Sequence, residues 1–358
     1  MSVHPVRTTN RVAADLDLVR HEVDAYLARL FDRALRDSAT VLEPGSPGLA
    51  PLRDMALAGG KRIRPAFVYW GFLAAGGDPD DDRVIEAGAV LELLHLFALV
   101  HDDVMDESLT RRSAPTIQVQ FADRHRALGL RGHAQRYGEN MAILLGDFAL
   151  LTCTEVLLSL PRRAQRIFYR AANQLVLGQY LDLENAAAVV VDDETSSRTA
   201  LLKTASYTVE GPLLVGMALT PTGPELEPCL RAYGRAVGQA FQHRDDLLDV
   251  FGDEAETGKP VAGDITHQKA TRLLATVRRN ASVGDRALLS LLEGPAAGDV
   301  ELESVRSLLL RTGAVDDLER LIDDLVAEAV TAIADAPMPA SSKEVLTDAA
   351  HFAGARRC

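Results

Sequence analysis

The stretch IEAGAVLELLHLFALVHDD, residues 85–103, is a long apolar run that ends in two aspartates. Its length and its many leucines and alanines are typical of a buried α-helix. Asp106 follows, so that the run closes with the pattern Asp-Asp-x-x-Asp. Successive helical residues are separated by about 100°, and Asp102 and Asp106 therefore lie on one face of the predicted helix.

The same pattern occurs again in the sequence FQHRDDLLDVFGD, residues 241–253. Carboxylates crowded at one place on a helix repel one another unless a cation lies between them. Their oxygens suit Mg²⁺ when room is left for the oxygens of a phosphate. Two solvated acidic helix ends are the simpler alternative. We predict instead that the two motifs hold several Mg²⁺ ions around a diphosphate. The predicted metal ligands are Asp102, Asp103, Asp106, Asp245, Asp246 and Asp249.

The composition favours helices and argues against several classes of function. Of the 358 residues, 47% are hydrophobic and only 5% aromatic, a balance that suits helices better than sheets. The net charge of −13 argues against binding to nucleic acid or to an anionic membrane. The three cysteines form no Cys-x-x-Cys pair, which argues against a disulfide framework or a zinc site. Without a signal peptide or a run of about eighteen uncharged apolar residues, we expect a cytoplasmic protein with no membrane span.

Helical periodicity dominates the chain. Residues 1–12 are predicted to be a flexible tail, and the Pro- and Gly-rich residues 43–51 to end the first helix. The predicted helices are 13–38, 64–75, 85–103, 139–160, 163–185, 198–219, 226–251, 270–293, 299–312, 314–333 and 341–355. No strand alternation or fixed-period repeat stands out. We therefore predict a single all-α domain, residues 13–358, built as a large helical bundle.

The segment AGGKRIRP, residues 58–65, is strongly basic within an acidic chain. Its glycines allow the backbone to approach a ligand closely, and its lysine and two arginines can supply charge and hydrogen bonds to a diphosphate. Arg111 and Arg112 follow the first aspartate motif and could reach a phosphate at the same place. A basic surface turn and weak ion pairs with nearby acidic residues are the alternatives.

The motifs of this chain, taken in order, resemble those of the trans-type isoprenyl diphosphate synthases, also called polyprenyl synthetases. They are GGKRIRP (59–65), HDDVMD with RR (101–112), LLGD (144–147), GQYLDL (178–183), KTASY (203–207), FQHRDDLLDVFGD (241–253) and GKPVAGD (258–264). The resemblance extends from about residue 20 to the C-terminus. It implies the isoprenoid synthase fold, a large all-α bundle around a central cavity, usually found in homodimers.

The resemblance also implies a reaction. Enzymes of this family are prenyltransferases that join isopentenyl diphosphate to an allylic diphosphate, which can be dimethylallyl, geranyl or farnesyl diphosphate. Mg²⁺ at the aspartate motifs stabilises the charge that develops on the departing diphosphate. The isopentenyl double bond then attacks the allylic cation, the resulting cation loses a proton to the departed diphosphate, and no side-chain nucleophile is needed. The absence of an evident Ser-His-Asp or Cys-His arrangement agrees with this chemistry.

Roles follow from the resemblance residue by residue. Isopentenyl diphosphate binding is implied for Lys61, Arg64, His95 and Arg112. Allylic diphosphate binding is implied for Arg111, Lys203, Thr204, Gln242, Lys259 and Lys269. Lys203 and Thr204 are also implied beside the carbocation. The sequence THQKAT around Lys269 departs from the family pattern, in which a glycine commonly precedes this lysine.

Product length is predicted from the residues about one helical turn before Asp102. Phe97 is bulky, Ala98 is small, and no residue is inserted between the aspartates. This combination most resembles the geranylgeranyl diphosphate synthases, with farnesyl diphosphate as the competing product. A terpene cyclase would have no use for the basic segment, and a non-catalytic partner subunit would show damage to an aspartate motif.

Overall fold

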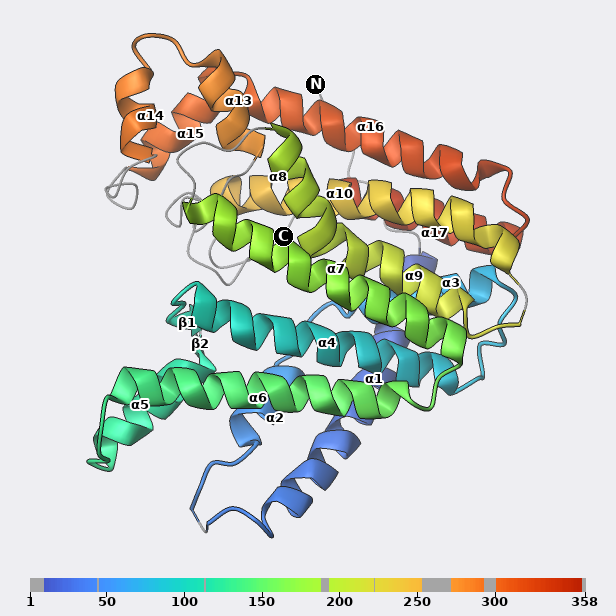
Figure 1. Ribbon diagram of the computed structural model, residues 1–358. Coiled ribbons are helices and arrows are strands. Elements are labelled where there is room, and N and C mark those ends of the chain that lie inside the picture. Colours follow the sequence, from blue (N-terminus) through green and yellow to red (C-terminus); the bar gives the residue numbers. More distant parts are fainter. Residues whose placement is uncertain are drawn as a thin grey trace. The chain divides into compact units, whose positions relative to one another are not determined.

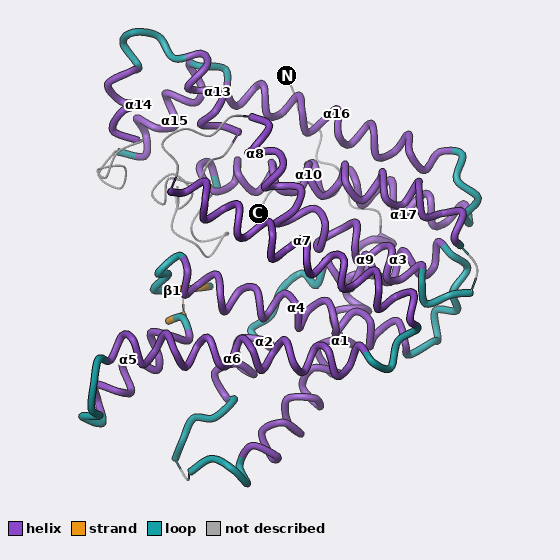
Figure 2. The backbone as a smooth tube through the Cα atoms, in the orientation of Figure 1, coloured by secondary structure: helices purple, strands orange, loops and turns teal. Residues whose placement is uncertain are grey.

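The protein is almost entirely helical (Figures 1 and 2). The computed structural model describes residues 10–43, 45–112, 114–187, 193–221, 223–252, 272–292 and 301–355. In these residues the strands are β1 (Thr110–Arg111) and β2 (Ala114–Pro115), which form one short antiparallel hairpin. The predicted all-α class is confirmed.

The chain divides into two compact units. The N-terminal unit comprises Ala13–Arg166 and Val215–Thr222. The C-terminal unit comprises Ile167–Leu214 and Gly223–Cys358, together with Met1–Val12. The single domain predicted for residues 13–358 stays a prediction. Of the predicted tail, residues 1–9 lie outside the described part, and Asn10 already begins α1.

The N-terminal unit is built around α4. Its helices are α1 (Asn10–Ser38), α2 (Ala50–Leu57), α3 (Ile63–Ala74), α4 (Arg83–Met105), α5 (Ile117–Ala127) and α6 (Ala134–Leu157). Because α4 is apolar on nearly all of its faces, it is stable only when other helices surround it. Helices α3 and α6 pack along it, and α5 packs on α6. The polar last turn of α4 contains the first aspartate motif.

The C-terminal unit has α10 as its central helix, against which η1, α16 and α17 pack. Its elements are α7 (Arg162–Ala187), α8 (Asp193–Ala200), the π-helix η1 (Leu201–Glu210), α9 (Gly211–Met217), the 3₁₀-helix η2 (Pro224–Leu226), α10 (Glu227–Phe251), α13 (Arg272–Asn280), α14 (Arg286–Leu292), α15 (Leu302–Arg311), α16 (Ala314–Ala334) and α17 (Ala340–Ala355). Helix α7 begins and α9 ends within the N-terminal unit. The sequence predicted one regular helix over residues 198–219, where the structure has α8, η1 and α9 in succession.

Two helices have the length and composition of membrane spans. These are α4 and α6, but the core helix of a water-soluble domain passes the same test. Of the most apolar stretch of α4, 61% is buried inside the protein, and of that of α6, 44% is buried. The absence of a membrane span stays a prediction.

Candidate active site

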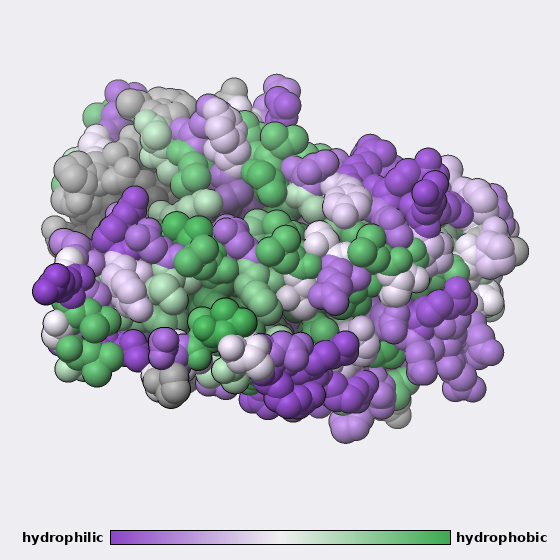
Figure 3. Space-filling model, turned by 60° about the horizontal axis from the view of Figure 1, so that its bottom comes forward, coloured by the Kyte–Doolittle hydropathy of each residue, from purple (hydrophilic) through white to green (hydrophobic). Residues whose placement is uncertain are grey.

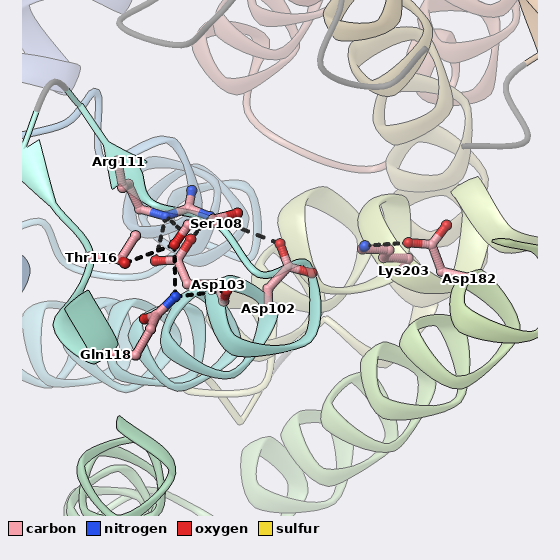
Figure 4. Close-up of polar contacts among 8 residues, drawn as sticks. All are labelled: Asp102, Asp103, Ser108, Arg111, Thr116, Gln118, Asp182 and Lys203. Carbon is pink, nitrogen blue, oxygen red and sulfur yellow. Dashed lines mark hydrogen bonds and ion pairs between the residues drawn. The ribbon is translucent and has the colours of Figure 1, made fainter. Parts of the chain in front are cut away.

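The first aspartate motif forms the end of α4, and its middle residue is held inside the protein (Figure 4). The side chain of Asp103 is 2% exposed, whereas that of Asp102 is 22% exposed. Arg111 donates from Nε to both oxygens of Asp103 at 2.9 Å and from Nη2 to Oδ1 at 2.6 Å. Asp106 ends the helix and is half-buried, with its backbone N–H bonded to the carbonyl of Asp102 at 2.8 Å. The outer two aspartates thus share the half-exposed face that their spacing predicted.

Burial opposes the charge of both partners in the Asp103–Arg111 pair. It raises the pKa of Asp103, while the hydrogen bond and charge of Arg111 act against that rise. For Arg111, the attraction of Asp103, Asp102 and Asp106 outweighs burial and raises the pKa of the guanidinium. Three short donor–acceptor contacts in a planar fork are the geometry of an ionised pair.

The loop after α4 folds back onto the end of that helix. Glu107 adopts a positive φ of 50°, and Ser108 N then donates to the carbonyl of Asp103 at 2.9 Å. Gln118, at the start of α5, donates from Nε2 to the carbonyls of Asp103 and Ser108, both at 2.8 Å. Thr116 Oγ1 also donates to the carbonyl of Ser108, at 2.8 Å. These contacts hold the hairpin that contains Arg111 against the aspartates (Figure 4).

Of the basic residues in the segment 59–65, Arg62 faces inward. It precedes α3 with a positive φ of 46° and is buried. Its guanidinium donates to Asp24 at 2.8 Å, to Glu92 at 2.6 Å and to the carbonyl of Ala56 at 2.6 Å. The charge of Arg62 is therefore matched by two carboxylates, and the residue joins α1, α2 and α4 at the start of α3.

The other basic residues of this segment lie nearer to solvent. Lys61 is exposed, and Arg64 is half-buried in the first turn of α3. The hairpin residue Arg112 donates from Nη1 to the carbonyl of Gly59. A Cβ atom on Gly60 would lie 3.3 Å from Arg112 Nη2, so a side chain there would crowd the guanidinium. The two basic stretches that were separate in the sequence are thus in contact.

Four arginines act on His95 of α4. Burial lowers the pKa of His95 well below its ordinary value, and the charges of Arg64, Arg111, Arg112 and Arg62 lower it further. We call these four arginines the cationic cluster. Burial also lowers the pKa of Arg112, with the charge of Arg62 acting in the same direction. A half-buried concentration of positive charge around a neutral histidine is suited to bind an anion.

Phe97 and Ala98, the predicted determinants of product length, are half-buried on α4. The ring of Phe97 packs edge-on against His101, with ring centroids 4.7 Å apart. His101 Nε2 lies 3.1 Å from the carbonyl of Ile143 on α6. A Cβ on Gly146 would lie 2.3 Å from the His101 ring, so glycine in the LLGD motif allows this approach. No role was predicted for His101, although it is the first residue of the motif HDDVMD.

The second aspartate motif lies on α10 and repeats the arrangement of the first. Its middle residue, Asp246, is buried and accepts a hydrogen bond from Gln242 Nε2 at 2.6 Å. The Nδ1 atom of His243 lies 3.8 Å from the other carboxylate oxygen of Asp246. The outer residues Asp245 and Asp249 are half-buried. Gln242, which the resemblance implied for the allylic substrate, contacts Asp246 in this structure.

Lys203 and Thr204 lie in η1 and are half-buried. Lys203 Nζ donates to Asp182 Oδ2 of α7 at 2.6 Å (Figure 4). Asp182 had no predicted role, although the motif GQYLDL contains it. The predicted residues Lys259 and Lys269 lie outside the described residues.

The donor atoms of both motifs fit Mg²⁺ better than a metal that needs a complete protein cage. Within the described ranges, no group of three His, Cys, Asp or Glu side chains is arranged to hold a metal ion by itself. Each motif instead offers two half-exposed carboxylates on one helix face. Mg²⁺ is commonly bound by one or two carboxylates, with water and substrate phosphates completing its shell.

Comparison with known proteins identifies the family. Residues 49–308 match the model of the polyprenyl synthetase family. A nonaprenyl diphosphate synthase of Mycobacterium tuberculosis is 33% identical over 314 residues, which are 85% of this chain and 86% of that protein. A geranylgeranyl diphosphate synthase of the same organism is 33% identical over 286 residues, 77% of this chain and 75% of that protein.

A solved structure shows the same fold. The geranylgeranyl pyrophosphate synthase of Corynebacterium glutamicum, solved with isoprenyl diphosphate and magnesium, has a TM-score of 0.88 and 32% identity. The match covers 96% of this chain and 99% of that one. The chain therefore belongs to the polyprenyl synthetase family. It is an enzyme of the trans-isoprenyl diphosphate synthase type, and the fold and family predicted from the sequence are confirmed.

Proposed function

We propose that this enzyme condenses isopentenyl diphosphate with an allylic diphosphate in a Mg²⁺-dependent reaction and releases geranylgeranyl diphosphate. The observation that carries the proposal is the pair of aspartate motifs. In each, the middle aspartate is buried in protein contacts and the outer two share a half-exposed helix face. Half-exposed carboxylates on one helix face are suited to metal ions that are themselves bound to a diphosphate.

The side chains have distinct tasks in this mechanism. When bound, Mg²⁺ supplies Lewis-acid stabilisation of the charge that develops on the leaving diphosphate. The outer aspartates Asp102, Asp106, Asp245 and Asp249 would hold the metal. Asp103 and Asp246 do not coordinate it but orient the motifs through Arg111 and Gln242. This division narrows the six ligands predicted from the sequence to four.

Arg64 and Arg112 of the cationic cluster bind isopentenyl diphosphate in this proposal, whereas Arg111 serves the allylic substrate. Arg64 and Arg112 supply charge to the phosphates, with Lys61 at the exposed edge. Neutral His95 donates or accepts a hydrogen bond without adding charge. Arg62 lies on the buried side of the cluster, where its guanidinium forms ion pairs with Asp24 and Glu92.

The allylic substrate is assigned to Arg111, Lys203, Thr204 and Gln242. The ion pair with Asp182 orients Lys203 and would weaken when a diphosphate competes for its ammonium group. The Lys203 ammonium group would then turn from Asp182 toward the diphosphate, which carries more negative charge. After the allylic bond breaks, the hydroxyl of Thr204 can turn its oxygen toward the cation.

Geranylgeranyl diphosphate is proposed as the product from Phe97 and Ala98. The names of relatives differ in product length and include farnesyl and geranylfarnesyl diphosphate synthases. Farnesyl diphosphate is the alternative. Both aspartate motifs and the basic segment are intact, which favours a synthase over a terpene cyclase or a non-catalytic subunit.

We also propose that the enzyme is a homodimer. Exposed apolar surface is visible on one face of the molecule (Figure 3). On α6, Leu144 and Leu151 are 61% and 68% exposed, and Leu158, the residue that follows the last turn of α6, is 72% exposed. Their seven-residue spacing places them in one stripe, the pattern by which helices pair. Exposed apolar residues so arranged mark a protein–protein contact, and a second copy of this chain supplies an identical stripe.

A direct assay tests the proposal. Purified protein is incubated with isopentenyl diphosphate, Mg²⁺ and each allylic primer in turn, and the products are separated by chromatography after removal of their phosphates. A twenty-carbon alcohol is expected as the main product, and a chelator should abolish its formation. Cyclic hydrocarbons or turnover that resists chelation would contradict the proposal.

A further inference from the structure

A buried carboxylate ends the π-helix that contains Lys203. The side chain of Glu210, the last residue of η1, is only 4% exposed. Arg231 of α10 donates from Nη1 to Glu210 Oε1, and Arg235 donates from Nε to Oε2 at 3.1 Å. Arg231 also donates from Nη2 to Glu227 Oε1 at 2.8 Å. We call Glu210, Arg231 and Arg235 the clamp. It joins η1 to α10 and has no part in the mechanism described above.

Glycines bring η1 unusually close to its neighbours. A Cβ on Gly234 of α10 would lie 2.5 Å from Glu210 Cα, and one on Gly238 would lie 2.5 Å from Ala205 Cα. On the other side, a Cβ on Gly178 of α7 would lie 2.3 Å from the backbone nitrogen of Lys203. Real Cβ atoms do not approach other atoms so closely. The backbone of η1 is therefore fitted against both helices, and small shifts of η1 change where Lys203 lies.

The clamp and the second aspartate motif lie on one stripe of α10. Arg231, Gly238 and Asp245 follow one another at intervals of seven residues, so they fall within about 40° of one another around the helix. Asp249 is four residues beyond Asp245 and shares its face. The stripe that contacts η1 through Gly238 thus contains a clamp arginine in its first half and the motif in its second. Fixing η1 on this stripe fixes Lys203 relative to the aspartates.

We propose that Glu210 is a positioning residue, and that its clamp by Arg231 and Arg235 sets the register of η1 on α10 and so places Lys203 for the allylic diphosphate. This inference rests on the proposed function, because it assumes that Lys203 meets that substrate. The clamp acts at one end of η1, and the Lys203–Asp182 ion pair acts near the other. With both ends held, a ten-residue π-helix can keep a conformation that is otherwise uncommon.

The test compares Glu210→Gln with Glu319→Gln in steady-state kinetics. Glu210→Gln keeps the shape of the side chain but weakens its hold on both arginines. Glu319 of α16 is the matched control, because it binds Arg244 of the same helix α10 at 2.7 and 2.5 Å and does not bind η1.

We expect Glu210→Gln to lower kcat by about ten- to a hundred-fold, since displacing a reacting group by about 1 Å has that effect. The KM for the allylic diphosphate should rise, while the KM for isopentenyl diphosphate stays within about two-fold, as its proposed residues belong to the N-terminal unit. Glu319→Gln should keep normal kinetics.

Two further variants separate positioning from loss of structure. Gly238→Ala changes no charge but pushes η1 away from α10, so it should reproduce the kinetic pattern of Glu210→Gln. Arg235→Lys should retain most of the activity that Arg235→Leu loses. Circular dichroism should show unchanged helix content in each variant. The inference is overturned if Glu210→Gln has normal kcat, if both substrates are affected equally, or if Glu319→Gln behaves alike. Failure of the wild-type protein to form any prenyl product would instead overturn the proposed function.

Discussion

Neighbouring aspartates in one motif do different things in this protein, and only the contacts of each residue reveal it. Asp102 and Asp103 are adjacent in the sequence, yet one is half-exposed and the other is enclosed by Arg111 and the hairpin. Asp246 repeats the enclosed arrangement with Gln242. In both motifs the middle carboxylate is the buried one, because its side chain points about 100° away from that of its neighbour.

Replacing the outer and middle aspartates should therefore have different effects. Asp102→Asn should lower kcat by about a hundred-fold or more, which is at least about 2.7 kcal/mol of transition-state stabilisation, while the fold stays intact. Asp103→Asn should leave Arg111 with a weakened partner in a buried place and lower the free energy of unfolding by about 1–3 kcal/mol. Kinetics and urea denaturation of both variants check this. Equal kinetic losses together with equal stabilities would contradict the division.

His95 should make the stability of the protein sensitive to acid. Its pKa in the folded protein lies below the ordinary value of about 6.5, so below that pH the unfolded chain binds a proton that the folded chain does not. The contribution is complete above pH ~6.5 and is lost as pH falls, by about 1.4 kcal/mol per pH unit until the folded pKa is reached. Urea denaturation at about pH 7.5 and pH 5.5 measures it. His95→Gln should lose less stability over this interval than the wild type, and an identical loss would refute the assignment.

At the scale of elements, the sequence predicted most helices because their apolar residues follow a clear period. The stretch 85–103 was instead predicted from its length and its leucines and alanines: it is apolar on nearly all of its faces, and in the structure α3 and α6 pack along α4. The π-helix η1 could not be predicted, because the apolar pattern of 198–219 is that of an ordinary helix. Its shape depends on glycines in α7 and α10 that are distant in sequence.

The site shows the same limit. Carboxylates and basic residues were recognisable as motifs, and helix spacing placed the outer two aspartates of each motif on one helix face. Partners outside the motif pattern were not recognisable. Asp24 and Glu92 could not be linked to Arg62 from the sequence, since the ion pairs depend on how α1 and α4 pack. Asp182 had a motif as its signal, but its contact with Lys203 depends on how α7 packs on η1.

A change in α4 should alter product length without altering the reaction. Phe97→Ala removes the ring that packs on His101, and the product should lengthen by at least one five-carbon unit. Ala98→Phe adds bulk on the adjacent face and should shorten the product toward farnesyl diphosphate. Chromatography of the dephosphorylated products measures both. If Phe97 serves only in packing, Phe97→Ala should instead lower the free energy of unfolding by about 3–5 kcal/mol and leave the product unchanged.

At the scale of the whole molecule, the apolar stripe of Leu144, Leu151 and Leu158 supports the proposed homodimer. Leu144, Leu151 and Leu158 place apolar surface in water, which is unfavourable by roughly 25 cal/mol for each Å² that pairing could bury. On helix α7, Tyr169 and Val176 are also seven residues apart, and they are 46% and 53% exposed. Exposed apolar residues with a period of seven, as on α6, are the arrangement expected where helices of two copies pack together.

Charging this stripe should therefore separate the subunits. Leu151→Asp places a carboxylate and its symmetry-related copy in the proposed interface, where neither has a partner. We expect sedimentation velocity to show a dimer for the wild type and a monomer for this variant at micromolar concentration. Leu128→Asp is the matched control, because Leu128 is 55% exposed at the end of α5 and lies outside the stripe. A monomeric wild type, or a Leu151→Asp variant that remains dimeric, would show that α6 does not form the interface.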